Sequence, residues 1–440
     1  MNVVFVLPSV EYNCLDNNKT NYCPCDNPEY DTSTIVTSVT TEWNLICERT
    51  SLASLAQSIL QVGILVGSFI LGQISDRYGR KLVVLISLFF EVVFVAVSAA
   101  VPEFWMFVVC RFLIGTMVGG TMLCCYVLVI ELCGKSFRPY MSGLSEVSLI
   151  LSYITLPIIA YFVREWRTLQ LVTSLPWVIV ATYYWLIPES PRWLISVGKR
   201  KEAIDVLTKI AKKNNRATDN IEHIVTKVEL SIKNQQVTST YADLFKTPKI
   251  RMYTIIAALI WMCCSHTFFG LNQYIGRLQG NIYLNVMLSA AFLVPGLIVI
   301  VIATLHFKRK LTIITTFVTA AVSLIIFIFI PSDLRAASLT FAIIGLIGAY
   351  TSFVQTYLFT SEVFPTVIRN TAIGFASMFA RVGGFIAPFV VNIGTEWVSI
   401  LIFSIIAFSA AILCYFLPET KDITLLNTIA DREKSPMNHV

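Results

Sequence analysis

The stretch Gly72–Lys81, GQISDRYGRK, is a dense polar turn between two long apolar runs of the chain. It combines glycines and an aspartate with Arg77, Arg80 and Lys81. Lys and Arg are enriched in the short cytosolic loops of membrane proteins, so we expect this turn to face the cytosol. An ordinary basic stop-transfer turn is the simpler alternative. Placing the turn inside assigns a side of the membrane to every other loop.

Composition places the chain among multispanning membrane proteins. Its 440 residues are 56% hydrophobic and 14% charged, with a mean hydropathy of +0.71, so it is far more apolar than a soluble domain. A net charge of +6 would suit a nucleic-acid partner, but the basic residues are dispersed among loops and form no single face. We therefore expect the lipid bilayer, and no nucleic acid, as a partner. The sequence leaves the oligomeric state open.

Apolar runs of about the 20 residues that a membrane span requires recur eleven times. With Gly72–Lys81 inside, 25 of the 33 Lys and Arg fall on the cytosolic side, six fall outside, and Arg111 and Arg381 lie within spans. This bias supports the topology. The predicted spans are residues 52–75, 82–101, 104–131, 140–163, 168–187, 251–275, 282–305, 311–331, 337–360, 371–391 and 397–417.

An internal repeat divides the chain into two halves. The segments YVLVIELCGKSFR (126–138) and YLFTSEVFPTVIR (357–369) share the pattern YxxxxExxxxxxR at an offset of 231. The pair Pro188-Glu189 recurs as Pro418-Glu419 at an offset of 230. Landmarks at nearly one offset are typical of transporters built from parallel repeats. We predict an all-α membrane protein of two six-helix halves.

The first helix of the first half is missing from this pattern. Residues 251–275 should have a partner near residues 21–45, but that region is polar. We expect a truncated, alternatively spliced or incorrectly assigned start, and an authentic eleven-span protein is the alternative. The predicted regions are a Cys-bearing loop at 1–50, a helical half at 51–187, a cytosolic loop with two amphipathic helices at 188–250, a second helical half at 251–417 and a tail at 418–440.

Residues 1–50 read as an extracellular loop. The segment has two basic and seven acidic residues, and its Asn18-Lys19-Thr20 sequon makes Asn18 a candidate glycosylation site. Of the eleven cysteines, four lie in this loop, where an oxidising environment allows disulfides. Two of them are separated by one proline and are not expected to pair with each other, which leaves two of the three possible pairings. The four are Cys14, Cys23, Cys25 and Cys47.

Several longer stretches resemble the organic cation, organic anion and carnitine transporter family of the major facilitator superfamily. The resemblance implies the major facilitator fold and alternating access about a central site, with no cofactor. Sugar transporters of the same architecture lack the large first loop, and the first helix is the one departure from the family pattern. The matching stretches are STIVTSVTTEWNLICE (33–48), GQISDRYGRK (72–81), PESPRWLISVGKRKEAI (188–204), GNIYLNVMLSAAFLVPG (280–296), SEVFPTVIRNTAIG (361–374) and LPETKD (417–422).

Charged residues at the cytosolic helix ends are candidates for an inner gate. In the resembling family, Asp76 would meet the start of a helix from the other half. Ion pairs across the two halves would latch the gate and break as the halves rock. Solvated charges that only anchor the topology are the alternative. The candidates are Asp76, Arg77, Arg80, Glu131, Arg138, Glu362 and Arg369.

Candidate substrate-binding residues are aromatic side chains with a few polar anchors, as ligand sites of such carriers require. Trp261, Phe268 and Phe353 match aromatic substrate-contact positions of the resembling family. Ordinary helix packing is the alternative for each aromatic residue. The candidates are Arg381, Glu146, Trp261, Phe268, Phe353, Tyr357, Met122 and Tyr126.

Arg381 is the sharpest of these candidates. It follows the start of its span by ten residues, about 15 Å into a hydrocarbon core roughly 30 Å thick. A charge at that depth needs a cavity or a carboxylate, and a pair with Glu146 or Glu91 is the simpler alternative. In the resembling family the cation branch tends to place an acid here, whereas the anion and carnitine branches place Arg. We expect an organic anion or a zwitterion as substrate, with an organic cation as the alternative that Glu146 keeps open.

Other function classes fit less well. The segment Gly134-Lys135-Ser136 ends like a phosphate-binding loop, but Val129 replaces its first glycine, so we do not expect an ATP-driven pump. Four scattered histidines, with no HExxH or GxSxG motif, indicate neither an enzyme nor a metal site.

Within the spans, Glu91 and Arg111 are expected to pair. A transport-inactive membrane protein remains an alternative, and we expect the plasma membrane with the Cys-bearing loop outside and the long loop and C-terminus in the cytosol.

Overall fold

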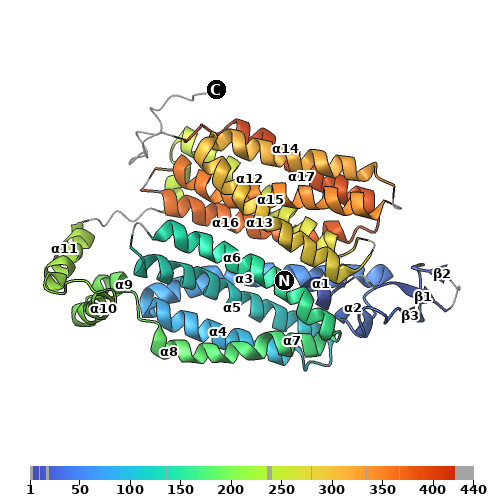
Figure 1. The fold of residues 1–440 in the computed structure, drawn as a ribbon, viewed down its shortest axis with the longest axis horizontal. Helices are drawn as coiled ribbons and strands as arrows, with labels where there is room; N and C mark the ends of the chain where they lie inside the picture. Colours follow the sequence, from blue (N-terminus) through green and yellow to red (C-terminus); the bar gives the residue numbers. More distant parts are fainter. Residues whose placement is uncertain are drawn as a thin grey trace. The chain divides into compact units, whose positions relative to one another are not determined.

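The computed structural model shows a protein built mainly of long α-helices (Figure 1). Within the described residues, ten segments are long and apolar enough to cross a membrane. The remaining predicted span, residues 140–163, is the fourth along the chain and corresponds to α6 (Arg138–Phe162), of which Glu146–Phe162 forms a shorter apolar helix. The prediction of an all-α membrane protein is confirmed. The structure describes residues 3–8, 10–15, 19–134, 137–234, 240–278, 280–331, 334–365 and 367–421.

Long helices suit a hydrocarbon environment because each satisfies its backbone hydrogen bonds internally. The break between the first two spans falls at Gly79, which has a φ of +111°. L side chains rarely adopt this backbone conformation, so the turn requires glycine. The spanning helices are α3 (Thr50–Tyr78), α4 (Arg80–Ser98), α5 (Phe104–Leu132), α6, α7 (Trp166–Ser174) continued by the 3₁₀ helix η2 (Leu175–Thr182) and α8 (Tyr183–Leu186), α12 (Pro248–Ile275), α13 (Ile282–His306), α14 (Arg309–Ile328), α15 (Arg335–Val363), α16 (Arg369–Val391) and α17 (Glu396–Tyr415).

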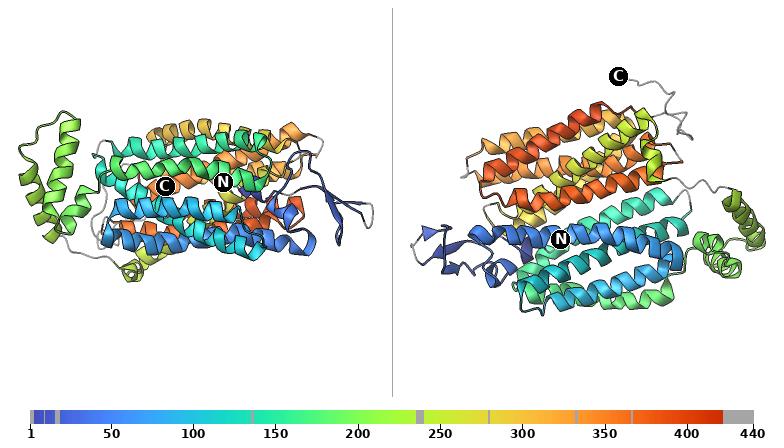
Figure 2. Two further views of the ribbon diagram at one scale, coloured as in Figure 1. Left: turned by 90° about the horizontal axis from the view of Figure 1, so that it is seen from below. Right: turned by 180° about the vertical axis from the view of Figure 1, so that it is seen from behind.

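The N-terminal module, residues 10–49, carries a three-stranded antiparallel sheet in the order β2-β1-β3 (Figure 2). Its disulfides are Cys14–Cys25 and Cys23–Cys47, so the prediction of two disulfides is confirmed and one of the two open pairings is selected. The candidate glycosylation site Asn18 lies outside the described residues. The elements are β1 (Tyr12–Cys14), β2 (Lys19–Thr20), β3 (Pro28–Tyr30), α2 (Val39–Glu42) and the 3₁₀ helix η1 (Cys47–Arg49), preceded by the short helix α1 (Val3–Val6).

The two predicted amphipathic helices of the central loop are present as α10 (Arg200–Lys213) and α11 (Ile221–Asn234). Their apolar faces pack on each other and on α9 (Pro191–Ser196), where Ala203 and Val225 are almost fully buried. The periodicity of these helices therefore reflects a small protein core. The short 3₁₀ helix η3 (Tyr241–Phe245) leads into α12.

The described residues form two units. Unit 1 draws on Met1–Gln61, Ile150–Leu169 and Ser239–Val440, and unit 2 draws on Val62–Leu149 and Gln170–Thr238. The core of unit 1 gathers apolar side chains from α12 and from α14 to α17. In unit 2, apolar side chains of α4 and α5 pack together, and α9 to α11 form a second cluster.

Removing the Cys23–Cys47 disulfide is expected to destabilise the N-terminal module. The bond joins cysteines 24 residues apart, and closing a loop of that length stabilises a fold by about 3 kcal/mol. In the Cys23→Ser/Cys47→Ser double variant, limited proteolysis of the module should be faster than in the unmodified protein. Peptide mapping without reduction should recover both observed pairs, and recovery of a peptide linking Cys14 to Cys23 would contradict the structure.

Candidate functional site

Aromatic side chains of α12 and α15 form a continuous cluster within unit 1. Phe268 stacks on Phe353 with ring centroids 5.7 Å apart, and Phe353 meets the edge of Tyr357 at 5.8 Å. Tyr357 in turn packs against Trp261 at 4.1 Å. The two residues on each helix are spaced by four or seven positions, which places them on one face. The structure therefore brings together four of the sequence-predicted site residues.

Members of this cluster differ in how far they can reach a ligand. Trp261 and Phe268 are almost fully buried, whereas 42% of Tyr357 is exposed. The indole N–H of Trp261 donates to Thr360 Oγ1 at 2.9 Å, which satisfies the polar end of the buried ring. Tyr357 is thus the most exposed of these rings, and the buried Trp261 and Phe268 lie on the inner side of the cluster. Sequence reasoning missed Thr360, although a buried tryptophan in a span needs such a partner.

Arg381, on α16, lies within electrostatic reach of the Tyr357 hydroxyl and is partly buried. The helices α16 and α12 pack closely at Gly383, where a Cβ would lie 2.2 Å from the Met262 carbonyl oxygen of α12. Among the residues described in unit 1, no carboxylate lies within 4.0 Å of the Arg381 guanidinium. A cation in this setting can bind a carboxylate supplied by a ligand.

The remaining sequence-predicted binding residues belong to unit 2. Met122 and Tyr126 lie one turn apart on α5, and each is more than half exposed. The Glu146 side chain, on α6, is partly buried. Their part in substrate binding stays a prediction.

The expected pairing of Glu91 with Arg111 is wrong. Glu91 accepts a hydrogen bond from Thr121 Oγ1 at 3.5 Å, and Thr121 lies ten residues, or about 15 Å, along α5 from Arg111. The two charges therefore sit at different depths. Arg111 lies over the Phe107 ring at 5.4 Å, and its Nε and Nη2 have no hydrogen-bond partner in the described part of the chain.

An ordered charge cluster surrounds the start of α4 in unit 2. The Arg80 guanidinium lies 2.9 Å from an Asp76 carboxylate oxygen and 3.4 Å from one of Glu131. Glu189 accepts hydrogen bonds from the backbone N–H groups of Arg80 and Lys81, both at 3.1 Å. A carboxylate at this position satisfies free donors of the first helical turn and favours its positive dipole end.

The same arrangement recurs at the start of α14 in unit 1. Arg309 Nε lies 3.5 Å from Glu362 Oε2. Glu419 accepts from the backbone N–H of Arg309 at 2.9 Å and from that of Lys310 at 3.2 Å. Corresponding residues of the two clusters are about 230 positions apart. The internal repeat is thus visible in the side-chain contacts as well as in the sequence.

The sequence-predicted gating residues divide between these two clusters. Arg80 and Glu131 pair within unit 2, while Glu362 takes Arg309 as its partner and interacts electrostatically with Arg369. The observed partners therefore come from the same half of the repeat, whereas the sequence suggested pairs across the halves. Their role as a gate stays a prediction.

Arg77 takes no part in the ion pairs observed among the described residues. Arg77 is exposed and lies over the ring of Tyr78 at 5.6 Å, and the side chain of Arg138 lies outside the described residues. Sequence reasoning missed Arg309, although the basic run at 308–310 recurs about 230 residues after the one at 77–81. The sequence pattern placed Glu189 and Glu419 at matching positions of the repeat but did not indicate that they cap helices.

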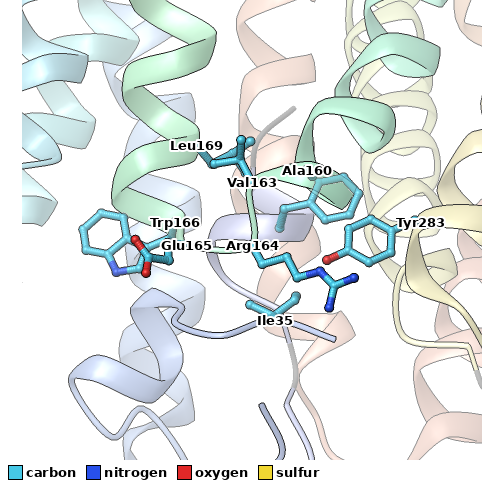
Figure 3. Close-up of a pocket in the computed structure, with 9 residues that line it drawn as sticks. Ile35, Ala160, Val163, Arg164, Glu165, Trp166, Leu169 and Tyr283 are labelled. Carbon is cyan, nitrogen blue, oxygen red and sulfur yellow. The ribbon is translucent and has the colours of Figure 1, made fainter. Parts of the chain in front are cut away.

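A small pocket in unit 1 lies beside the N-terminal module (Figure 3). It has room for about one water molecule. None of the sequence-predicted site residues lines it, so it is not the candidate substrate site. The lining residues are Phe5, Ile35, Ala160, Val163, Arg164, Glu165, Trp166, Leu169 and Tyr283.

Comparison with known proteins extends over most of the chain. Residues 1–429 match the family described as sugar (and other) transporter. The organic cation transporter protein of Drosophila melanogaster is 33% identical over 418 residues, covering 93% of this chain and 76% of that protein. Human organic cation/carnitine transporter 2 is 34% identical over 408 residues, covering 92% and 73%. Mouse solute carrier family 22 member 3 is 33% identical over 402 residues, covering 90% and 72%.

Solved structures agree on the fold. The inward-open conformation of the xylose transporter XylE from E. coli superposes with a TM-score of 0.71, at 16% identity over 86% of this chain and 88% of that one. At this identity the likeness concerns the fold alone. The aligned relatives, the family match and the fold together show that this multi-pass membrane protein is not an enzyme but a member of the sugar (and other) transporter family of the major facilitator superfamily, in its solute carrier 22 branch.

Proposed function

We propose that this protein carries small organic ions across the plasma membrane by alternating access, and that a zwitterion with a carboxylate and a quaternary ammonium group is its preferred substrate. The observation that carries this proposal is Arg381 beside an aromatic cluster, with no carboxylate near its guanidinium in the described part of unit 1. A ligand that brings its own carboxylate would compensate this charge.

Arg381 supplies the recognition of the carboxylate. A guanidinium presents a planar fork of donors that fits a carboxylate through two parallel hydrogen bonds. Arg381 is partly buried and within electrostatic reach of Tyr357, and a setting sheltered from water strengthens such a contact relative to the same contact in water. A substrate with no carboxylate would leave the guanidinium uncompensated, so this residue disfavours simple cations.

Aromatic side chains supply the recognition of the ammonium group. A quaternary ammonium is attracted to the face of an aromatic ring, with a contribution of about 0.5 to 2 kcal/mol. Tyr357 offers the exposed ring, and Phe353 is partly buried next to it. Trp261 fixes the Tyr357 ring through their edge contact, and its own position is held by Thr360.

The names of the relatives support the same substrate class. The Drosophila relative is called an organic cation transporter and the human relative an organic cation/carnitine transporter, so a simple organic anion is less favoured than the sequence alone suggested. A simple organic cation is the second candidate, with Glu146 as its anionic contact. The proposed topology places the N-terminal module outside and α9 to α11 in the cytosol, consistent with the distribution of Lys and Arg.

We assign the two charge clusters to the inner gate. By this topology the Arg80–Glu131 and Arg309–Glu362 pairs lie at the cytosolic ends of helices that must shift when the gate opens. The four side chains are no more than one-fifth exposed, so the pairs are screened less than surface ion pairs. Each pair then biases the balance between gate conformations.

Replacing Arg381 by Ala is expected to lower the affinity for L-carnitine by about 30-fold or more, since losing a desolvated charge contact costs at least about 2 kcal/mol. Uptake of tetraethylammonium should be unchanged or improved, because the substitution removes a like charge. The measurement is competitive uptake of the two radiolabelled probes. Arg335→Ala, at an exposed arginine at the start of α15, is the matched control and should change neither affinity.

Two outcomes would contradict this substrate assignment. Saturable uptake of tetraethylammonium with no carnitine competition would favour the simple cation. Unchanged carnitine affinity in Arg381→Ala would remove Arg381 from the site. An absence of saturable uptake for both probes, together with no shift in melting temperature on their addition to the purified protein, would favour the transport-inactive alternative.

Replacing Glu131 or Glu362 by Gln is expected to change the turnover rate several-fold while surface expression is retained. Each substitution leaves the partner arginine uncompensated, and a partly buried ion pair contributes on the order of 1 kcal/mol. The control is Glu202→Gln, which removes an ion pair whose side chains are more than half exposed. If the two test variants alter turnover no more than the control does, the clusters only anchor the topology.

A further inference from the structure

The N-terminal module meets the second half of the repeat at Tyr283, the second residue of α13. The Tyr283 hydroxyl donates a hydrogen bond to the carbonyl oxygen of Thr34 at 2.8 Å. Its ring also stacks on that of Phe5 in α1, just before the module, with centroids 5.5 Å apart and planes 11° from parallel. Tyr283 is 8% exposed, so both contacts are sheltered from water. The side chain points toward the module in Figure 3.

The module is held to the α6–α7 loop of the first half by more polar contacts. The backbone segments 36–37 and 164–166 hydrogen-bond side by side, and Glu42 accepts from two side chains at the start of α7. These contacts are Val36 N to Arg164 O at 3.1 Å, Trp166 N to Thr37 O at 3.2 Å, Arg164 Nη1 to Ser33 O at 3.2 Å, Trp166 Nε1 to Glu42 Oε2 at 2.7 Å and Arg167 Nη2 to Glu42 Oε1 at 2.5 Å.

Unit 1 also contains a polar seam between the start of α3 and the end of α16. Ser58 Oγ donates to the Phe385 carbonyl oxygen at 2.6 Å, and Ser54 Oγ donates to that of Pro388 at 3.3 Å. The helix α3 belongs to the first half of the repeat and α16 to the second. Alternating access moves one half against the other, so these contacts must part when the outer side opens.

We propose that Tyr283 is a positioning residue of the transport cycle, which holds the N-terminal module across the outer ends of both halves while the α3–α16 seam is closed. The sidedness of this proposal rests on the topology in the proposed function. The module makes several hydrogen bonds to the α6–α7 loop and the start of α7, and it makes fewer contacts to α13. When the outer ends separate, it stays with the loop and releases Tyr283.

This assignment makes the hydrogen bond from Tyr283 to Thr34 part of the balance between open and closed outer states. A contact made in one state and absent from the other shifts the balance by its own free energy. Loss of one hydrogen bond should then raise the population of the open state roughly 2- to 12-fold. A residue with a merely structural role would lower the stability of the module without changing this population.

The test measures how readily the seam opens. Ser58 is fully buried, so the thiol introduced by Ser58→Cys reacts with a membrane-impermeant maleimide from outside only when the seam parts. In this background, Tyr283→Phe removes the hydroxyl and keeps the stacked ring. The labelling rate, after subtraction of the rate without Ser58→Cys, should rise roughly 2- to 12-fold.

Tyr161→Phe is the matched control. The Tyr161 ring meets that of Tyr283 edge-on with centroids 5.6 Å apart, and its hydroxyl makes no hydrogen bond in the described part of the chain. This variant should label at the unmodified rate. A variant that fails to reach the cell surface is purified and labelled in lipid nanodiscs, where the same ratio between Tyr283→Phe and Tyr161→Phe is expected.

Two results would overturn the assignment. Tyr283→Phe could label at the unmodified rate, or Tyr161→Phe could accelerate labelling equally. Labelling needs no substrate, so its outcome is separate from that of the uptake experiments. Faster labelling in a protein that transports neither probe would refute the proposed substrate and retain the role of Tyr283. Efficient carnitine uptake with unchanged labelling would support the proposed substrate and refute the role of Tyr283.

Discussion

In each half of this protein, a glutamate carboxylate caps a helix by accepting hydrogen bonds from its first backbone N–H groups, and the neighbouring turn and ion pair depend on this contact. Glu189 binds the start of α4 and Glu419 binds the start of α14. The first turn of any helix has N–H groups without intrahelical partners. In a protein packed into a bilayer these donors need an internal acceptor or water. The two glutamates supply the acceptor and, with it, a fixed place where the preceding turn ends.

The fixed turn also positions the basic side chains that follow it. Arg80 and Arg309 are the first residues of their helices, so capping of the backbone orients each guanidinium toward a carboxylate at the end of a neighbouring helix. The turn before α4 also requires glycine, because the φ of Gly79, +111°, is one that L side chains rarely adopt. The cap thus fixes the start of the helix and the direction of the ion pair.

Two arginine side chains at the ends of spans have carboxylate partners, and the two within spans do not have them in the described part of their own unit. At the ends, the Arg80 and Arg309 guanidiniums have carboxylate partners within 4.0 Å. Within the spans, Arg381 lies within electrostatic reach of the Tyr357 hydroxyl and Arg111 lies over a phenylalanine ring, and neither forms an ion pair in the described part of its own unit. A charge of this kind is costly in hydrocarbon unless a ligand or water compensates it. This contrast is the reason for placing substrate recognition at Arg381 and gating at the clusters.

The sequence by itself determined the spans, the repeat, the side assigned to each loop and the grouping of four cysteines in one polar segment, because apolar length, charge bias and spacing are local properties of the chain. It could not determine which partner each side chain meets. The depth and rotation of elements distant in sequence decide these partners: Cys25 for Cys14, Glu131 for Arg80 and Thr121 for Glu91.

The same holds for Tyr283. In the sequence it is an ordinary aromatic residue near a span end, and only the fold brings Phe5 and Thr34 to it. Helices separated by 100 residues or more of chain have no local signal that sets their relative rotation, and a shift of one turn, about 5.4 Å, exchanges one set of partners for another.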